Sequence, residues 1–243
     1  MTARTEALDA LDRRVQNGLI VSCQPVDNGP MDNDETVMRL ASAAIAGGAD
    51  GLRIEGAPRV ARVREALPQA LIIGIVKRDL PDSPVRITPF LSDVEALALA
   101  GADIIAVDAT ARPRPAPLNA LVDAIHGHGR VAMADCSCMA DAANAYRLGA
   151  DIVGSTLSGY TGGPVPAEPD FELLQLLAQS YPRVMAEGRF NTPQDCAKAR
   201  QLGAWAVTVG TAITRTEVVT QWFAEATSAP LLQKAQAVAS EHS

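Results

Sequence analysis

Two side chains, Lys77 and Glu187, stand where they could transfer protons, because each follows an apolar run typical of a buried strand. A lysine base must be neutral, yet with a reference pKa of about 10.4 only about one molecule in 2,500 is neutral at pH 7. Partial burial and nearby cations, for which Arg53 and Arg78 are candidates, would lower that pKa. Lys77 as base, with Glu187 as proton donor or acceptor opposite it, is one interpretation. The alternatives are a lysine that reaches solvent and a carboxylate in a structural ion pair.

Glycines and an arginine follow the last two predicted strands and could bind a phosphate group. Gly188 comes directly after Glu187, and Gly210, Thr211 and Arg215 follow the apolar run AWAVTV. Glycine lets backbone N–H groups approach an anion closely, and the start of a following helix adds partial positive charge. We therefore predict a phosphate site beside the carboxylate. Tight turns and a solvated arginine are the alternatives.

Three further polar side chains, Gln24, Arg53 and Asp135, also end apolar runs. Gln24 suits a hydrogen bond to a sugar or an amide, or it belongs to a plain polar rim. Arg53 either clamps the substrate or pairs with Glu187. Asp135 either orients a neighbour or binds sugar hydroxyls, and its alternative role is to cap the next helix.

A lysine base and a carboxylic acid beside a phosphate site suit proton abstraction next to a carbonyl. That is the chemistry of a sugar-phosphate isomerase or epimerase. The same lysine could form a Schiff base, as in barrel aldolases and lyases, and these residues do not separate the two reactions. A phosphosugar sensor without catalysis is the alternative from a different class of protein.

No metal site and no cofactor are expected. The histidines His126, His128 and His242 lie on a predicted helix end and on the tail, and no H-E-x-x-H or CxxC pair is present. Their absence from strand ends counts against a metal-dependent pentose-phosphate epimerase. The chain also lacks the G-x-S-x-G motif, so a hydrolase triad has no support.

The elements that must position these residues follow a repeating order. Gly-Ala-Asp or Gly-Ala-Trp precedes a predicted strand at Gly48, Gly101, Gly149 and Gly203, at intervals of about 50 residues. Each interval also holds a further strand and two helices, so four modules give eight βα units. This predicts a closed (β/α)8 TIM barrel, whose active site lies at the carboxyl ends of the strands. An open doubly wound sheet is the alternative, and its G-x-G-x-x-G turn is missing after the first strand.

We expect the whole chain, 1–243, to form a single barrel domain. Residues 1–16 are predicted to form a short amphipathic helix that could cover one open end of the barrel. Ser92 or Asp93 is expected to cap the helix that follows a proline-containing loop. The tail over 228–243 is expected to be peripheral.

Composition fits an ordinary globular protein: 243 residues, 48% hydrophobic and 20% charged. A net charge of -7 argues against nucleic acid or an anionic membrane as partner. The four cysteines are scattered in apolar contexts, as expected for reduced thiols in a cytoplasmic protein. The first residues lack the apolar core of a signal peptide, and no run approaches the roughly 18 apolar residues of a membrane span.

Several motifs resemble those of the N-acetylmannosamine-6-phosphate 2-epimerase family, from about Gly18 to Phe223. They are SCQP, GIVKRD, DATARPRP, MADCS, STLSGYT, AEGRFNTPQ and VGTAITR. The resemblance implies a (β/α)8 barrel of the phosphate-binding type that interconverts N-acetylmannosamine 6-phosphate and N-acetylglucosamine 6-phosphate in sialic acid and aminosugar catabolism. It also implies a phosphorylated N-acetyl aminosugar as the binding partner, and a homodimer.

The resemblance further implies roles for individual residues. Lys77 is the catalytic base and Glu187 its partner. The residues around the substrate and at its phosphate end are Gln24, Arg53, Asp135, Gly188, Gly210 and Arg215. The chain departs from the expected pattern after Arg53, where IEGAPR replaces a RANG-like loop. In the implied mechanism Lys77 removes the C2 proton of the open-chain aldehyde, and either Glu187 or Lys77 returns a proton to the opposite face.

Overall fold

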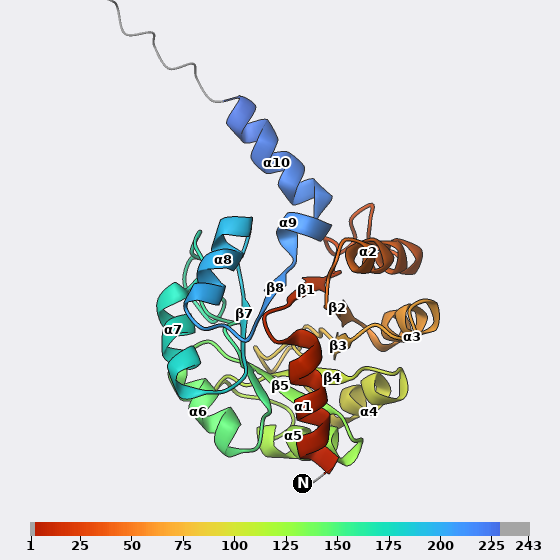
Figure 1. Ribbon diagram of the computed structural model, residues 1–243, viewed down its shortest axis with the longest axis vertical. Helices are drawn as coiled ribbons and strands as arrows, with labels where there is room; N and C mark the ends of the chain where they lie inside the picture. The colour runs from red at the N-terminus through yellow and green to blue at the C-terminus, as the bar shows by residue number, and fades with distance from the viewer. Residues whose placement is uncertain (1–2, 229–243) are drawn as a thin grey trace, which may run out of the picture.

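The computed structural model describes residues 3–228, which form a closed barrel of eight parallel strands (Figure 1). The strands pair in sequence order, and the last closes the barrel on the first. They are β1 Leu19–Ser22, β2 Gly51–Glu55, β3 Ile72–Ile75, β4 Ile104–Asp108, β5 Val131–Asp135, β6 Ile152–Gly154, β7 Val184–Glu187 and β8 Ala206–Val209. The predicted (β/α)8 barrel is confirmed, and the open doubly wound sheet is excluded.

Helices alternate with the strands and lie around the outside of the barrel (Figure 1). After β1 to β7 come α2 Asp34–Ala46, α3 Ala57–Ala66, α4 Leu91–Leu99, α5 Leu118–Gly127, α6 Met139–Arg147, α7 Phe171–Ser180 and α8 Pro193–Gln201. After β8 the chain forms a short helix, α9 Thr211–Thr214, and then α10 Thr216–Thr227. None of the helices within residues 3–228 is long and apolar enough to cross a membrane.

The repeated glycines end helices, as predicted. Gly48, Gly101, Gly149 and Gly203 have φ angles of 97°, 94°, 98° and 97°. Side chains strongly disfavour this left-handed conformation, whereas glycine adopts it freely and turns the chain from a helix into the next strand. The repeat in the sequence is therefore a repeat of one backbone turn.

Helix α4 begins earlier than predicted. Its first residue is Leu91 and its N-cap is Phe90, so the expectation of a cap at Ser92 or Asp93 was wrong. The carboxylate of Asp93 instead accepts a hydrogen bond from the N–H of Phe90, from the third position inside the helix. An acidic residue thus satisfied the start of the helix from within the first turn rather than from the cap.

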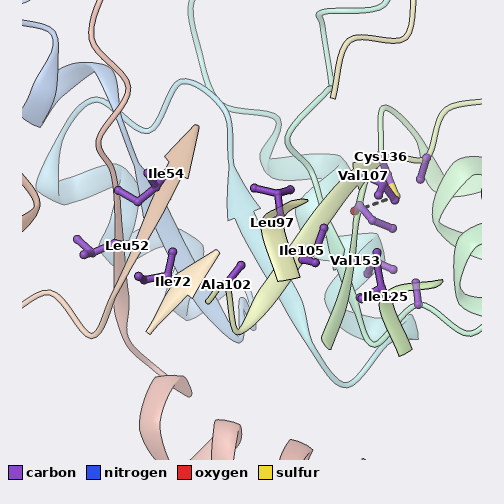
Figure 2. Close-up of a cluster of buried hydrophobic side chains, with 14 of the residues drawn as sticks. Leu52, Ile54, Ile72, Leu97, Ala102, Ile105, Val107, Ile125, Cys136 and Val153 are labelled. Carbon is purple, nitrogen blue, oxygen red and sulfur yellow. Dashed lines mark hydrogen bonds between the residues drawn. The ribbon is translucent and has the colours of Figure 1, made fainter. Parts of the chain in front are cut away.

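Two hydrophobic cores lie on either side of the barrel wall, because alternate strand residues face opposite sides. The outer core packs the strands against the helices and includes Leu52, Ile54, Ile72 and Ile105 (Figure 2). The inner core fills the barrel with a second set of strand side chains, among them Ile73, Ile104, Met133, Ile152 and Met185. The interior is therefore packed below the level at which the strands end.

The first helix, α1 Ala3–Val15, lies at the amino end of the barrel (Figure 1). Its residues Leu11 and Val15 are buried against the inner core. Apart from Ser228, the tail predicted to be peripheral lies outside the described residues. The open end of the barrel is consequently the carboxyl end, where the polar residues gather.

Candidate active site

A cavity of about 370 Å³ opens at the carboxyl ends of the strands. Its size suits a small molecule. The predicted site residues that line it are Gln24, Arg53, Lys77, Glu187, Gly188, Gly210, Thr211 and Arg215. Asp135 is the predicted site residue that does not line it. These residues lie together because every second strand residue points into the barrel. Glu187, for example, lies two residues after the buried Met185 and so shares its face of β7.

Arg53 forms a buried ionic bridge between two carboxylates. Its side chain is 1% exposed, and its Nη2 lies 2.6 Å from Oδ2 of Asp135. Its Nη1 donates to Oε2 of Glu187 at 3.0 Å. Burial alone would lower the pKa of Arg53, but the charges of Asp135 and Glu187 outweigh it and raise that pKa. Of the two roles considered for Arg53, the structure bears out the ion pair with Glu187.

Asp135 lies one layer below the cavity. It is 0% exposed and accepts hydrogen bonds from Arg53 and, at 2.7 Å, from Oγ1 of Thr156. It does not cap the next helix, because the N-cap of α6 is Cys138. Its carboxylate therefore orients two neighbours that do line the cavity.

Glu187 holds its proton more tightly than an ordinary carboxyl group. Burial raises the pKa of Glu187 to about 7, although the positive charge of Arg53 works against the rise. Asp135 adds to it through like-charge repulsion. A group with a pKa near neutrality can both give and take a proton at physiological pH.

Lys77 faces the same cavity without a close partner. Its ammonium group forms no hydrogen bond or ion pair with residues 3–228. Burial lowers the pKa of Lys77, and the charge of Glu55 opposes this while that of Arg215 adds to it. A lowered pKa increases the neutral fraction, which is the form a base requires.

Of the two candidate cations for lowering the pKa of Lys77, Arg53 acts on it and Arg78 does not. Arg78 points away, pairs with Asp93 at 2.6 Å and lies over the ring of Phe90. Arg53 and Arg215 are the cations that act on Lys77. Adjacent residues of an extended segment face opposite sides, so Lys77 and Arg78 do not share a surface.

The predicted phosphate end lies where β7 and β8 finish. Gly188 has a φ of 108°, which strains any other residue, and Gly210 precedes α9, whose first residue is Thr211. Nε of Arg215 donates to the backbone carbonyl of Gln24 at 3.1 Å, which fixes the arginine at the cavity edge. The side-chain amide of Gln24 donates to Oγ of Ser22 at 2.7 Å.

Sequence reasoning assigned no role to a second polar network at the cavity. Asp108 is 1% exposed and accepts from Arg112 at 2.6 Å and from Thr110 at 2.6 Å. Asp108 and Arg112 both line the cavity. The signal was the DATARPRP motif, in which the polar residues recur at every second position and so share one side of the segment.

A further contact holds the loop after β6 over the cavity. Arg189 donates to the carbonyl of Ser158 at 2.5 Å and to that of Glu168 at 2.7 Å. Its guanidinium lies 5.3 Å from the ring centre of Tyr160, and both side chains line the cavity. Within residues 3–228, no group of three or more His, Cys, Asp or Glu side chains is arranged to hold a metal ion.

Comparison with known proteins gives one consistent family. Residues 37–229 match the family described as "Putative N-acetylmannosamine-6-phosphate epimerase". A protein of the same description, a 2-epimerase from Proteus mirabilis, is 54% identical over 215 residues, which cover 88% of this chain and 92% of that protein. One from Photobacterium profundum is 56% identical over 211 residues, covering 87% and 89%. The solved N-acetylmannosamine-6-phosphate 2-epimerase from Clostridium perfringens matches with a TM-score of 0.86 and 40% identity, over 89% of this chain and 96% of that one.

Proposed function

We propose that Lys77 and Glu187 carry out the reaction of this chain, because the chain belongs to the N-acetylmannosamine-6-phosphate 2-epimerase family. The enzyme is an isomerase acting on a carbohydrate. Its reaction interconverts N-acetylmannosamine 6-phosphate and N-acetylglucosamine 6-phosphate, which differ at carbon 2. The observation that carries the proposal is an amine with a lowered pKa, unpaired among residues 3–228, that faces the same cavity as a carboxyl group with a raised pKa.

The first step removes the proton from carbon 2 of the open-chain sugar. Neutral Lys77 takes that proton, the C–H bond breaks, and its electron pair forms a C1–C2 double bond while the carbonyl electrons move onto the C1 oxygen, which gives an enolate with the N-acetylamino group still on carbon 2. We assign the stabilisation of this negative charge to the guanidinium of Arg53, which lines the cavity. A proton then returns to the opposite face, from Glu187 in a two-base mechanism or from Lys77 after the intermediate turns in a one-base mechanism.

Asp135 acts through its neighbours in this proposal. It fixes Arg53 and Thr156, and Arg53 in turn fixes Glu187. We therefore assign Asp135 to positioning, while Arg53 both positions Glu187 and meets the substrate. A buried carboxylate that accepts several charged or polar donors holds such an arrangement rigidly.

The phosphate group binds at the opposite end of the sugar. Backbone N–H groups of Gly188, Gly210 and Thr211 and the guanidinium of Arg215 supply donors there. Gln24 also lines the cavity; its side-chain nitrogen donates to Ser22, and its side-chain oxygen, unpaired within residues 3–228, can accept from a sugar hydroxyl or an amide. Binding energy at the phosphate would hold carbon 2 against the base.

Proton NMR of N-acetylmannosamine 6-phosphate in deuterated water tests the proposal. Loss of the C2 proton signal and growth of N-acetylglucosamine 6-phosphate, undiminished by a chelator, are expected. Deuterium at carbon 2 of the newly formed epimer, with none at carbon 2 of the unreacted substrate, would favour two bases. Trapping of Lys77 by borohydride with substrate would instead favour a Schiff-base aldolase, and tight binding without exchange would favour a sensor.

We also propose a homodimer, and α10 supports it. Each helix from α2 to α8 buries side chains, whereas α10 buries none and projects away from the barrel (Figure 1). Its Trp222 and Phe223 are exposed. An unpartnered helix with exposed aromatic residues suits burial against another chain.

A groove on the barrel matches that helix. It has a volume of about 490 Å³ and lies between β1, β8 and α8, with Leu19, Val207, Cys196 and Ile213 in its walls. This is where the helix after β8 packs in a closed (β/α)8 barrel. Bonds from Arg215 to Gln24 and from Thr214 to Ser22 hold the α9–α10 joint turned away from it. We propose that each copy places α10 in the groove of the other.

The setting of the reaction follows from the same substrate. We propose a place in sialic acid and aminosugar catabolism, where N-acetylmannosamine 6-phosphate must be converted to its epimer. The four cysteines are free, which supports the reducing cytoplasm as location. We also propose that the reaction needs no metal, since an amine and a carboxyl group suffice for the proton transfers; the chelator experiment tests this.

A further inference from the structure

The cavity contains a buried hydroxyl group that the mechanism above does not use. Thr208 lies in β8, is 2% exposed and lines the cavity. Its Oγ1 has no hydrogen-bond partner among residues 3–228. Buried polar groups are nearly always paired, and an unpaired one costs free energy in the folded state. A ligand that paired with this hydroxyl would remove that cost.

The fold does not need a hydroxyl at this position. Thr208 stands between Val207 and Val209 in a short buried strand. Valine has nearly the shape of threonine and, like threonine, is favoured in strands. The feature that distinguishes threonine here is its hydroxyl, which both donates and accepts hydrogen bonds and belongs to a residue that lines the cavity.

The position of Thr208 in the barrel puts it opposite the middle of a bound hexosamine 6-phosphate. It pairs in register with Glu187 on β7, at the end of the cavity where carbon 2 reacts. Gly210, which lies two residues further on, just after β8, and belongs to the proposed phosphate end, lines the same cavity. A hexosamine 6-phosphate that spans these two ends would present its hydroxyls on carbons 3 and 4 to the wall between them.

We propose that Thr208 determines substrate specificity by hydrogen-bonding a sugar hydroxyl on carbon 3 or carbon 4. The inference rests on the proposed function, because it requires a phosphorylated hexosamine in the cavity. A site that pairs a buried polar group with a substrate hydroxyl rejects analogues that lack the hydroxyl. Thr208 thus selects for the sugar, independently of Lys77 and of the phosphate end.

Substitution separates this role from a structural one. Thr208→Val should lower kcat/KM for N-acetylmannosamine 6-phosphate about tenfold, as loss of one neutral hydrogen bond does. Thr208→Ser, which keeps the hydroxyl, should stay within about threefold of wild type. The thermal midpoint of Thr208→Val should equal or exceed that of wild type, because the hydroxyl has no partner to lose in the described part of the chain.

Deoxy substrates identify the contact. With 3-deoxy- or 4-deoxy-N-acetylmannosamine 6-phosphate, one analogue should abolish the difference between wild type and Thr208→Val, because the partner hydroxyl is gone. If wild type and Thr208→Val turn over N-acetylmannosamine 6-phosphate with the same kcat/KM, the inference is overturned while the proposed function stands. A loss of the same size on both analogues and on the full substrate would also overturn the inference. An inactive wild type would overturn the proposed function as well.

Discussion

Nη1 of Arg53 lies 3.0 Å from Oε2 of Glu187, so the carboxyl group proposed to carry a proton is tied to a buried guanidinium. Arg53 belongs to β2 and Glu187 to β7, two strands that are not neighbours in the barrel. Burial pushes the pKa of Glu187 up while Arg53 holds it back. Position and acidity of this carboxyl group therefore depend on one arginine, and both can be tested.

Replacing Lys77 should remove the base. Lys77→Met is expected to lower kcat about 10²- to 10⁴-fold, since this is the contribution of general-base catalysis. Its affinity for the substrate, measured by calorimetry, should change less than about tenfold because the phosphate contacts remain. Lys198→Met is the matched control, because Lys198 lies over Phe171 outside the cavity and should leave kcat unchanged. Turnover by Lys77→Met near the wild-type rate would remove Lys77 from the mechanism.

Glu187→Gln should change how stability depends on pH. The pKa of Glu187 is raised from 4.5 to about 7, so the folded state binds its proton more tightly than the unfolded chain does. The stability that this provides is fully present below about pH 4.5 and is lost as the pH rises through 7. The free energy of unfolding of Glu187→Gln relative to wild type should therefore increase between pH 5 and pH 8. Urea titrations at both pH values measure it.

The exposed Glu95 provides the control for that comparison. Glu95→Gln should differ from wild type by the same amount at both pH values. A difference between Glu187→Gln and wild type that also stays constant with pH would mean that Glu187 titrates normally.

Arg53→Met should destabilise the fold strongly. It leaves Asp135 and Glu187 buried without their cation, which typically costs about 3–5 kcal/mol. The loss should shrink at pH 5, where Glu187 takes up a proton. Arg62→Met, at an exposed ion pair, should cost no more than about 1 kcal/mol. Equal, small losses for both variants at pH 7 would contradict the buried bridge.

Arg215→Gln should weaken binding of the phosphate end. Loss of one charge-assisted contact is worth about 1.5–3 kcal/mol, so KM for the phosphosugar should rise about 10- to 100-fold. Arg39→Gln, on the exposed face of α2, should leave KM unchanged. If Arg215→Gln lowers the affinity for inorganic phosphate as little as Arg39→Gln does, the anion binds elsewhere.

The oligomeric state should depend on α10. Sedimentation of the wild type should give twice the mass of one chain, and Trp222→Ser with Phe223→Ser should give a single chain. Ile213→Glu in the groove should have the same effect, because a charge would be buried there. Glu225→Gln on α10 is a control that should remain dimeric. A monomeric wild type would rule out the exchange.

The ends of the strands could be predicted from the sequence, because they are marked by local signals. These are the hydrophobic runs, the glycines that end helices, and the alternation of inward and outward side chains along a strand. They predicted the barrel and the polar residues at its carboxyl end, including Lys77 and Glu187. Which of those residues meet is decided by the width and register of the barrel, so the choice between two roles for Arg53 needed the structure. The assignment of site roles stays a prediction until the substitutions above are made.

One open question and one wrong expectation have local physical reasons. Arg53 and Arg78 were both candidates for the cation near Lys77, and Arg78 is not near it because adjacent residues point in opposite directions and Arg78 pairs with Asp93. Asp93 was considered as a cap of α4, but it satisfies the N–H of Phe90 from inside the helix. A carboxylate that serves both an arginine and a helix start cannot be assigned from spacing alone, since each use is sensible by itself.

The position of α1 determines how substrate and product enter and leave the barrel. Because α1 and the packed interior close one end of the barrel, both epimers must enter and leave through the cavity opening at the other end. The two epimers therefore compete for one site. Accumulated product slows the forward reaction because it occupies the site, and also because it brings the reaction closer to equilibrium. The direction of net reaction is set by the ratio of the two epimers in solution relative to their equilibrium ratio.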